Sequence, residues 1–234
     1  MEKAARSPYR SLSPQELLGR PLNEIEQKFA PSKLFLSSGS GRTVPLPGPR
    51  VAIVGSRKAS SQGIFLAREI ASFLAAKNVI VVSGLAAGID TAAHEAAIRQ
   101  GGSTIAVLGT SLDKSYPARN TELQRTIMHD HWALSQFPVG YPTEPKNFVI
   151  RNRTMALISD VSIIVEAGET SGSLHQGWEA LRLGRPLFIS EVITSNATLK
   201  WPKKMMDYGA VELKEYEEVI EVLPSSERIV HIIR

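Results

Sequence analysis

The chain has 234 residues, of which 43% are hydrophobic and 6% aromatic, and it carries 27 Lys and Arg against 23 Asp and Glu, a net charge of +4. This length suffices for one substantial domain with a small appendage. No apolar run approaches the roughly 18 residues of a membrane helix, and the amino terminus lacks the apolar stretch of a signal peptide. The absence of cysteine excludes disulfides and zinc ribbons. We therefore expect a cytoplasmic protein whose mild positive charge permits polyanion binding without indicating it.

Residues 1–50 are interpreted as an amino-terminal extension and linker. The Ser-Pro-Gln-Glu pattern at 13–16 combines a capping box with proline at the first helical position and predicts a short helix. A second short helix is expected at 23–29 and a strand at 34–36. The segment 44–50 holds three prolines and is typical of a linker.

Residues 51–190 alternate regularly between short β-branched runs and helical stretches. The expected strands lie at 51–55, 79–83, 104–109, 133–135, 161–166 and 186–189. The expected helices lie at 62–76, 89–100, 119–129, 147–158 and 173–183. Several strands are apolar on both faces, as a central parallel sheet covered by helices requires. The pattern predicts an α/β, Rossmann-like, doubly wound fold with a mostly parallel sheet and helices on both faces.

Residues 191–234 are interpreted as a carboxy-terminal extension that packs on this core. Apolar residues near helical spacing between 213 and 223 predict a helix whose opposite, acidic face is solvated. The apolar tail at 229–233 indicates a strand at a sheet edge or a dimer contact.

Small residues follow four of the predicted strands. These segments are Gly55-Ser56-Arg57, Ser83-Gly84 through Gly88, Gly109-Thr110-Ser111, and Gly168 through Ser171-Gly172-Ser173. In a doubly wound sheet these strand ends lie on one edge, where ligands bind. Glycine lets the backbone approach an anion, and N–H groups at helix starts point toward it. One such turn is more often an ordinary strand–helix connection, but four on one edge predict a phosphate-binding site.

Two basic features accompany these turns. Arg57 follows the first turn and is expected to contact a phosphate with two nitrogens. Lys146, Arg151 and Arg153 surround Asn152 at what we expect to be the start of a helix. Cations there oppose the helix dipole, a cost that a bound anion would offset. A salt bridge to a carboxylate is the alternative for one of the two arginines.

Asp90 and His94 are four residues apart on a predicted helix. Two ligands without a third are weak grounds for a metal site, and no metal or other cofactor is expected. We expect Asp90 to cap or orient the second turn and His94 to pack or pair locally.

Together these motifs resemble the DNA-processing protein A family (DprA, also called Smf). The matching segments are 51–57, 83–86, 88–90, 93–94, 102–109, 112–113, 116–117, 120, 135–138, 148, 151–153, 165–167, 171–174 and 184–186. The resemblance covers about residues 20–190. It implies a dimeric, non-enzymatic protein that binds single-stranded DNA without base specificity, protects it during natural transformation and helps to load the RecA recombinase in DNA recombination. It also implies a positive DNA pocket lined by Arg57, Arg151 and Arg153, with Lys114 and Lys146 nearby.

The chain departs from the family pattern at several positions. Gln136 stands where glutamate is usual, Val149 where a second proline is usual, and His175-Gln176 where Thr-Ala is usual. The segment 190–192 lacks the glycine that usually follows the last core strand. The length leaves no room for the family's full helical or winged-helix appendages, so we expect a minimal or divergent member.

The main alternative is a protein of the same superfamily that senses or processes a nucleotide-derived ligand, for example in a defence system. That superfamily looks to include the Lonely Guy phosphoribohydrolases, which use an arginine and a glutamate beside a glycine-rich turn. Here His175 and Gln176 occupy the glutamate position, and neither supplies a carboxylate to stabilise positive charge. Hydrolysis is therefore not expected. A structural protein with a vestigial pocket is a third alternative.

Overall fold

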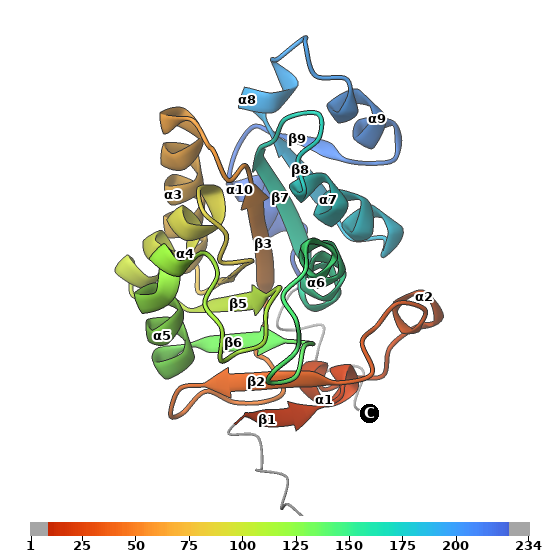
Figure 1. Cartoon of the computed structure of the whole chain (residues 1–234). Helices are drawn as coiled ribbons and strands as arrows, with labels where there is room; N and C mark the ends of the chain where they lie inside the picture. The colour runs from red at the N-terminus through yellow and green to blue at the C-terminus, as the bar shows by residue number, and fades with distance from the viewer. Residues whose placement is uncertain (1–8, 225–234) are drawn as a thin grey trace, which may run out of the picture.

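A computed structural model describes residues 9–224, and the strands in this part of the chain form one sheet (Figure 1). The strands are β1 (Arg10–Leu12), β2 (Leu34–Ser38), β3 (Arg50–Gly55), β4 (Ile80–Ser83), β5 (Thr104–Leu108), β6 (Trp132–Ser135), β7 (Val161–Glu166), β8 (Leu187–Ser190) and β9 (Val211–Leu213). The helices are α1 (Pro14–Leu18), α2 (Glu24–Gln27), α3 (Ser61–Ala76), α4 (Ile89–Arg99), the short 3-10 helix η1 (Ala118–Asn120), α5 (Thr121–Asp130), α6 (Pro145–Ile158), α7 (Ser173–Arg182), α8 (Glu191–Thr194), α9 (Trp201–Asp207) and α10 (Glu217–Glu221).

The strand order places a topological switch in the middle of the sheet. The order is β1-β2-β6-β5-β4-β3-β7-β8-β9. From β6 to β9 all neighbours are parallel, whereas β2 runs antiparallel to β6 and β1 antiparallel to β2. The chain moves outward from β3 to β6 and then returns to the other side of β3 as β7. The predicted doubly wound, mostly parallel α/β fold is confirmed.

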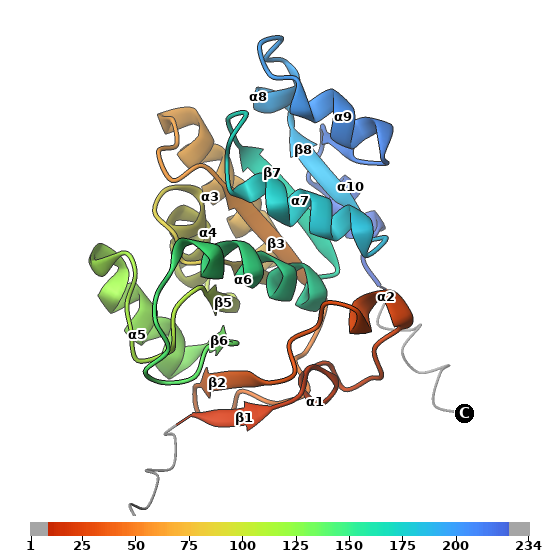
Figure 2. The ribbon, with the colours of Figure 1, turned by 45° about the vertical axis from the view of Figure 1, so that its right-hand side comes forward.

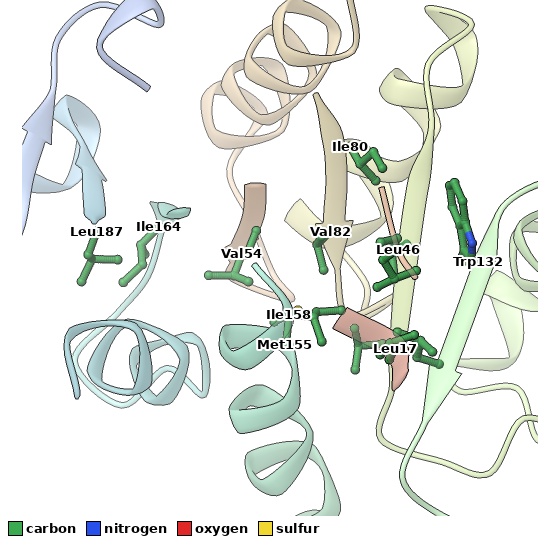
Figure 3. Close-up of a cluster of buried hydrophobic side chains, with 14 of the residues drawn as sticks. Leu17, Leu46, Val54, Ile80, Val82, Trp132, Met155, Ile158, Ile164 and Leu187 are labelled. Atoms are coloured by element: carbon green, nitrogen blue, oxygen red, sulfur yellow. The ribbon is translucent and has the colours of Figure 1, made fainter. Parts of the chain in front are cut away.

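Helices cover both faces of the sheet because its strands are apolar on both sides. On one face, Ile53 packs in a cluster with Ile70 and Leu74 of α3. On the other face, Met155 and Ile158 of α6 lie beside strand residues such as Val54 and Val82 (Figure 3). Helix α7 lies next to α6 on this second face (Figure 2). In the described part of the chain, none of the helices combines the length and hydrophobicity that crossing a bilayer requires.

The amino-terminal segment joins the sheet of residues 51–190. The two predicted short helices are confirmed as α1 and α2, and both begin with a capping box, formed by Ser13 with Glu16 and by Asn23 with Glu26. The predicted strand is confirmed as β2, which pairs with β6. The side chain of Leu17 is fully buried in the core cluster that includes α6.

The carboxy-terminal segment differs from its predicted structure. The helix expected between 213 and 223 is confirmed only as α10 (Glu217–Glu221), because Leu213 belongs to β9, which pairs with β8 and extends the sheet. Helix α10 covers only residues 217–221, with Tyr216 against Phe73 of α3 at 5.5 Å between ring centroids. Pairing with β8 overrides the helical spacing of the apolar residues. The strand predicted at 229–233 lies outside the described residues.

Candidate nucleic-acid interface

A cleft of about 620 Å³ opens at the carboxyl ends of β3 and β7. This is the switch point of the sheet, where ligands of doubly wound folds bind. Its walls are formed by Gly55, Ser56, Arg57 and Lys58 after β3, by Gly168, Thr170, Ser171, Gly172 and Ser173 after β7, by Pro145, Phe148, Val149, Arg151, Asn152 and Met155 of α6, and by Val54, Ala86, Asp90 and Tyr116. The turns after β3 and β7 therefore converge as predicted.

The glycines after β4 and β5 have a different role, since Gly84 and Gly109 make room for side chains and Gly88 makes room for neighbouring backbone. A Cβ atom at Gly84 would lie 2.2 Å from Nη1 of Arg151, and one at Gly109 would lie 2.5 Å from Cδ1 of Phe148. Gly88 has a φ of +81°, and a Cβ there would lie 2.3 Å from the carbonyl oxygen of Ser56. These three glycines are outside the lining of the cleft but allow its walls to form.

Arg151 lies at the base of the cleft and is 5% exposed. Its Nη1 donates to the carbonyl oxygens of Gly84 at 2.5 Å and Val107 at 2.7 Å, and its Nε donates to Oδ1 of Asn152 at 3.0 Å. Its Nη2 has no hydrogen-bond partner among the described residues, so this nitrogen can donate to a bound anion. Burial lowers the pKa of Arg151, while the charge of Asp90 raises it.

Arg57 lies over the ring of Phe148, with its Cζ 5.1 Å from the ring centroid. Tyr116 packs against the same ring at 5.1 Å between centroids and is 49% exposed. Within residues 9–224, no carboxylate lies within salt-bridge distance of Arg57 or of the neighbouring Lys58. The cleft therefore presents two exposed cations without partner anions beside an aromatic pair.

Asp90 orients the turn after β4, as predicted. Its Oδ2 accepts from the backbone N–H groups of Gly84 at 3.2 Å and Ala86 at 3.3 Å. Burial raises the pKa of this carboxyl, and Arg151 together with these donors lowers it. His94 pairs locally through Nδ1 with Oγ1 of Thr104 at 2.7 Å, and burial lowers its pKa to about 3.

Several predicted residues are not brought to the cleft. Arg153 faces away from it and pairs with Glu179 of α7 at 3.4 Å, which is the salt-bridge alternative. Lys146 pairs with Glu144 at 2.6 Å, Lys114 donates to the carbonyl oxygen of Tyr141, and Ser83 is buried with its hydroxyl on the carbonyl oxygen of Ile53. The expectation that Arg151 and Arg153 lie at a helix start is wrong. Helix α6 begins at Pro145, so both lie beyond the first turn, where the dipole effect fades.

Sequence reasoning passed over Phe148, Tyr116 and Lys58 as site residues. The low aromatic content argued against a surface built on aromatic rings. The sequence did contain one indication that Phe148 belongs to the site, because this residue lies between Lys146 and Arg151. Among the lining residues of the described chain, Asp90 is the one carboxylate, against Arg57, Lys58 and Arg151. The cleft is therefore positively charged and suited to an anion.

Comparison with known proteins gives one consistent result. The family model described as DNA recombination-mediator protein A matches residues 15–224. The chain belongs to the DprA/Smf family. It is 43% identical to the DNA processing protein DprA of Streptococcus pneumoniae over 159 residues, which are 68% of this chain. It is 36% identical to the protein Smf of Escherichia coli over 194 residues, which are 82% of this chain. It spans about half the length of these relatives, 55% and 51% respectively.

Solved structures of DprA proteins share the fold. The S. pneumoniae DprA structure superposes with a TM-score of 0.79 and 32% identity, covering 93% of this chain and 75% of that one. A Helicobacter pylori DprA structure, described for its single-stranded DNA binding mode, gives a TM-score of 0.74 and 25% identity over 92% and 95% of the two chains. A molybdenum cofactor binding protein from Rippkaea orientalis, at 18% identity and a TM-score of 0.54, is similar in fold alone.

Two departures from the DprA pattern serve packing. Gln136 accepts a hydrogen bond from Oγ1 of Thr154 at 2.6 Å. Gln176 is fully buried. With its amide oxygen toward Oγ of Ser162, its nitrogen donates to the carbonyl oxygen of Asn152 at 2.7 Å, which joins α7 to α6. His175, the neighbouring departure, is exposed on α7.

Proposed function

We propose that this DprA-family chain binds single-stranded DNA in the cleft between β3, β7 and α6 without base specificity. The observation that carries the proposal is the exposed Arg57, which has no carboxylate partner in the described chain and lies on Phe148 at the cleft. Family membership supports the further proposals that the protein forms homodimers, protects single strands and assists a RecA-type recombinase in DNA recombination and transformation.

Each part of a DNA strand has a matching group in the cleft. Arg57, Lys58 and Nη2 of Arg151 can neutralise and bind phosphates. The hydroxyls of Ser171 and Ser173 are hydrogen-bonded to each other at 2.7 Å, which leaves one hydroxyl proton of the pair as a neutral donor. The ring of Tyr116, which is 49% exposed, offers a face on which any base can stack, while Phe148 supports both that ring and Arg57. Phosphate contacts and stacking both tolerate every base, so the expected binding is independent of sequence.

We propose binding without hydrolysis. The candidate carboxylates near the cleft are already engaged: Glu166 accepts from the backbone N–H and hydroxyl of Ser60, and Glu179 pairs with Arg153 and Arg182. A second candidate function is recognition of a small nucleotide-derived ligand, because about 620 Å³ falls within the range of small-molecule sites.

Binding of labelled oligo-dT at several salt concentrations tests the proposal. We expect affinity to rise between oligomers of about six and about 20 nucleotides and to fall steeply with salt because counterions are released. Arg57→Ala should weaken binding to all sequences alike, whereas Arg125→Ala, which removes an exposed arginine of α5 paired with Glu122, should not. Tight binding of a mononucleotide, with no dependence on strand length, would favour the second candidate. A base-selective loss in Arg57→Ala would contradict a phosphate role.

A further inference from the structure

A second cluster of cations surrounds an exposed ring at the end of α2. Cζ of Arg182 lies 4.5 Å from the centroid of the Phe29 ring, Cζ of Arg153 lies 5.2 Å from it, and Nζ of Lys28 lies 5.6 Å from it. Glu179 bridges the two arginines, at 3.4 Å to Arg153 and 2.7 Å to Arg182. We call these five residues the Phe29 cluster. It lies where α2 approaches α6 and α7 (Figure 2).

The chemistry of the Phe29 cluster exceeds what packing requires. Phe29 is 40% exposed and Arg153 is 41% exposed, so neither is part of the core. Glu179 and Arg182 are 16% and 28% exposed, and Arg182 also donates to the carbonyl oxygen of Ile25 at 3.2 Å, so this pair holds α2 against α7. Lys28 and Arg153 are the surplus cations around this one carboxylate. An exposed ring beside guanidinium planes is a combination on which unpaired bases stack while their phosphates are neutralised.

The Phe29 cluster is continuous with the cleft. Asn152 lines the cleft and donates to the carbonyl oxygen of Gly172 at 3.0 Å, and the next residue, Arg153, reaches the cluster. Ser173, the first residue of α7, also lines the cleft. Arg182 ends the same helix, about 14 Å further along its axis. At ~3.4 Å per stacked nucleotide this distance corresponds to about four nucleotides.

We propose that the Phe29 cluster is a second contact for single-stranded DNA, reached by a strand that leaves the cleft along α6 and α7. A base stacks on the exposed side of Phe29, and Arg153, which contacts Glu179 through Nε and keeps both Nη atoms without a partner in the described chain, binds the adjacent phosphate. This inference rests on the proposed function, because the strand reaches the cluster from the cleft. It assigns Arg153 to the extension of the site and leaves the cleft to Arg57 and Arg151.

Two oligomer lengths separate the two contacts. We expect Phe29→Ala to weaken binding of an oligo-dT of about 20 nucleotides about fivefold or more, the lower end of the effect of one stacked base. An oligomer of about three nucleotides, which is too short to reach from the cleft to the cluster, should be unaffected. Arg153→Gln should reduce the salt dependence for the longer oligomer by about 0.7 in the slope of log K against log salt. The matched control is Phe65→Ala, which removes a ring that is 63% exposed on α3.

The outcomes distinguish this inference from the proposed function. It is overturned if Phe29→Ala binds the longer oligomer as tightly as Phe65→Ala does, or if it weakens both lengths equally. A wild-type chain that binds neither oligomer refutes the proposed function itself. If Phe29→Ala unfolds at a lower temperature than Phe65→Ala, the salt dependence of Arg153→Gln tests the inference instead, because this substitution removes an exposed charge without leaving a cavity. A salt dependence equal to that of the wild type then overturns the inference.

Discussion

Replacing Arg151 by methionine tests whether this arginine holds the site together. The substitution keeps an unbranched side chain but removes every hydrogen bond. The carbonyl oxygens of Gly84 and Val107 then lose their donor, at about 1–3 kcal/mol for each buried group left unpaired. Asp90 also loses the positive charge that lowers its pKa. Breaking a buried charge interaction costs about 3–5 kcal/mol, which is the destabilisation we expect.

Urea unfolding, followed by tryptophan fluorescence, measures this change. A lower midpoint at constant slope reports lost stability and not a change in the unfolded state. Arg57→Ala is the comparison, because it removes an exposed arginine of the same cleft and should alter stability by less than about 0.5 kcal/mol. Adding Asp90→Asn to Arg151→Met should recover part of the loss, since it removes the buried carboxylate that Arg151 no longer offsets.

The reasoning would be refuted by an Arg151→Met protein that unfolds within about 1 kcal/mol of the wild type yet no longer binds oligo-dT. Arg151 would then be chiefly a ligand contact. A double variant no more stable than the single one would show that Arg151 and Asp90 are not coupled.

Three further outcomes follow from the structure. Gly109→Ala should displace Phe148, because the new Cβ would lie 2.5 Å from the ring, and should weaken oligo-dT binding in a titration. The pKa of His94 is about 3 in the folded protein against 6.5 in the unfolded chain, so the unfolded chain takes up a proton first as the pH falls. Between pH 6.5 and about pH 5 this proton uptake should lower the free energy of unfolding by about 2 kcal/mol, measured by urea unfolding. Glu26→Gln should cost about 1–3 kcal/mol in the same assay, because the carboxylate is 4% exposed and pairs with two arginines at 2.6 and 2.9 Å.

Each of these outcomes has its own control. Gly41→Ala strains a backbone with a φ of +79° outside the cleft but places its Cβ more than 4 Å from any other group, so it should leave binding unchanged. Equal binding by Gly109→Ala and the wild type would contradict the positioning role of the ring. His94→Asn should lose stability less steeply with acid than the wild type does; parallel curves would show that His94 is not the group responsible. Lys203→Ala, which breaks an exposed pair with Asp207, should change stability by at most about 1 kcal/mol. If Glu26→Gln changes the free energy of unfolding by no more than Lys203→Ala does, burial does not strengthen the Glu26 ion pairs.

Local patterns were enough to predict most elements and the class of fold. The capping boxes at Ser13 and Asn23 and the alternation of apolar runs with helical stretches depend on residues close in sequence. The convergence of the glycine turns after β3 and β7 was also predictable, because a parallel sheet brings such turns to one edge. The fold and the position of the cleft were therefore predictable before any contact was known.

The tertiary structure decided which side chains line the cleft. Arg151 and Arg153 are two residues apart in one motif. Successive residues of a helix are rotated by about 100°, so Arg151 lies at the cleft and Arg153 at the Phe29 cluster. Gly84 and Gly109 resemble phosphate-binding turns in sequence, yet they accommodate Arg151 and Phe148. The pairing of β2 with β6 and of β9 with β8 joins segments that are far apart in the chain. Neighbouring residues set local conformation, whereas burial against distant segments determines which groups of a motif meet in one site.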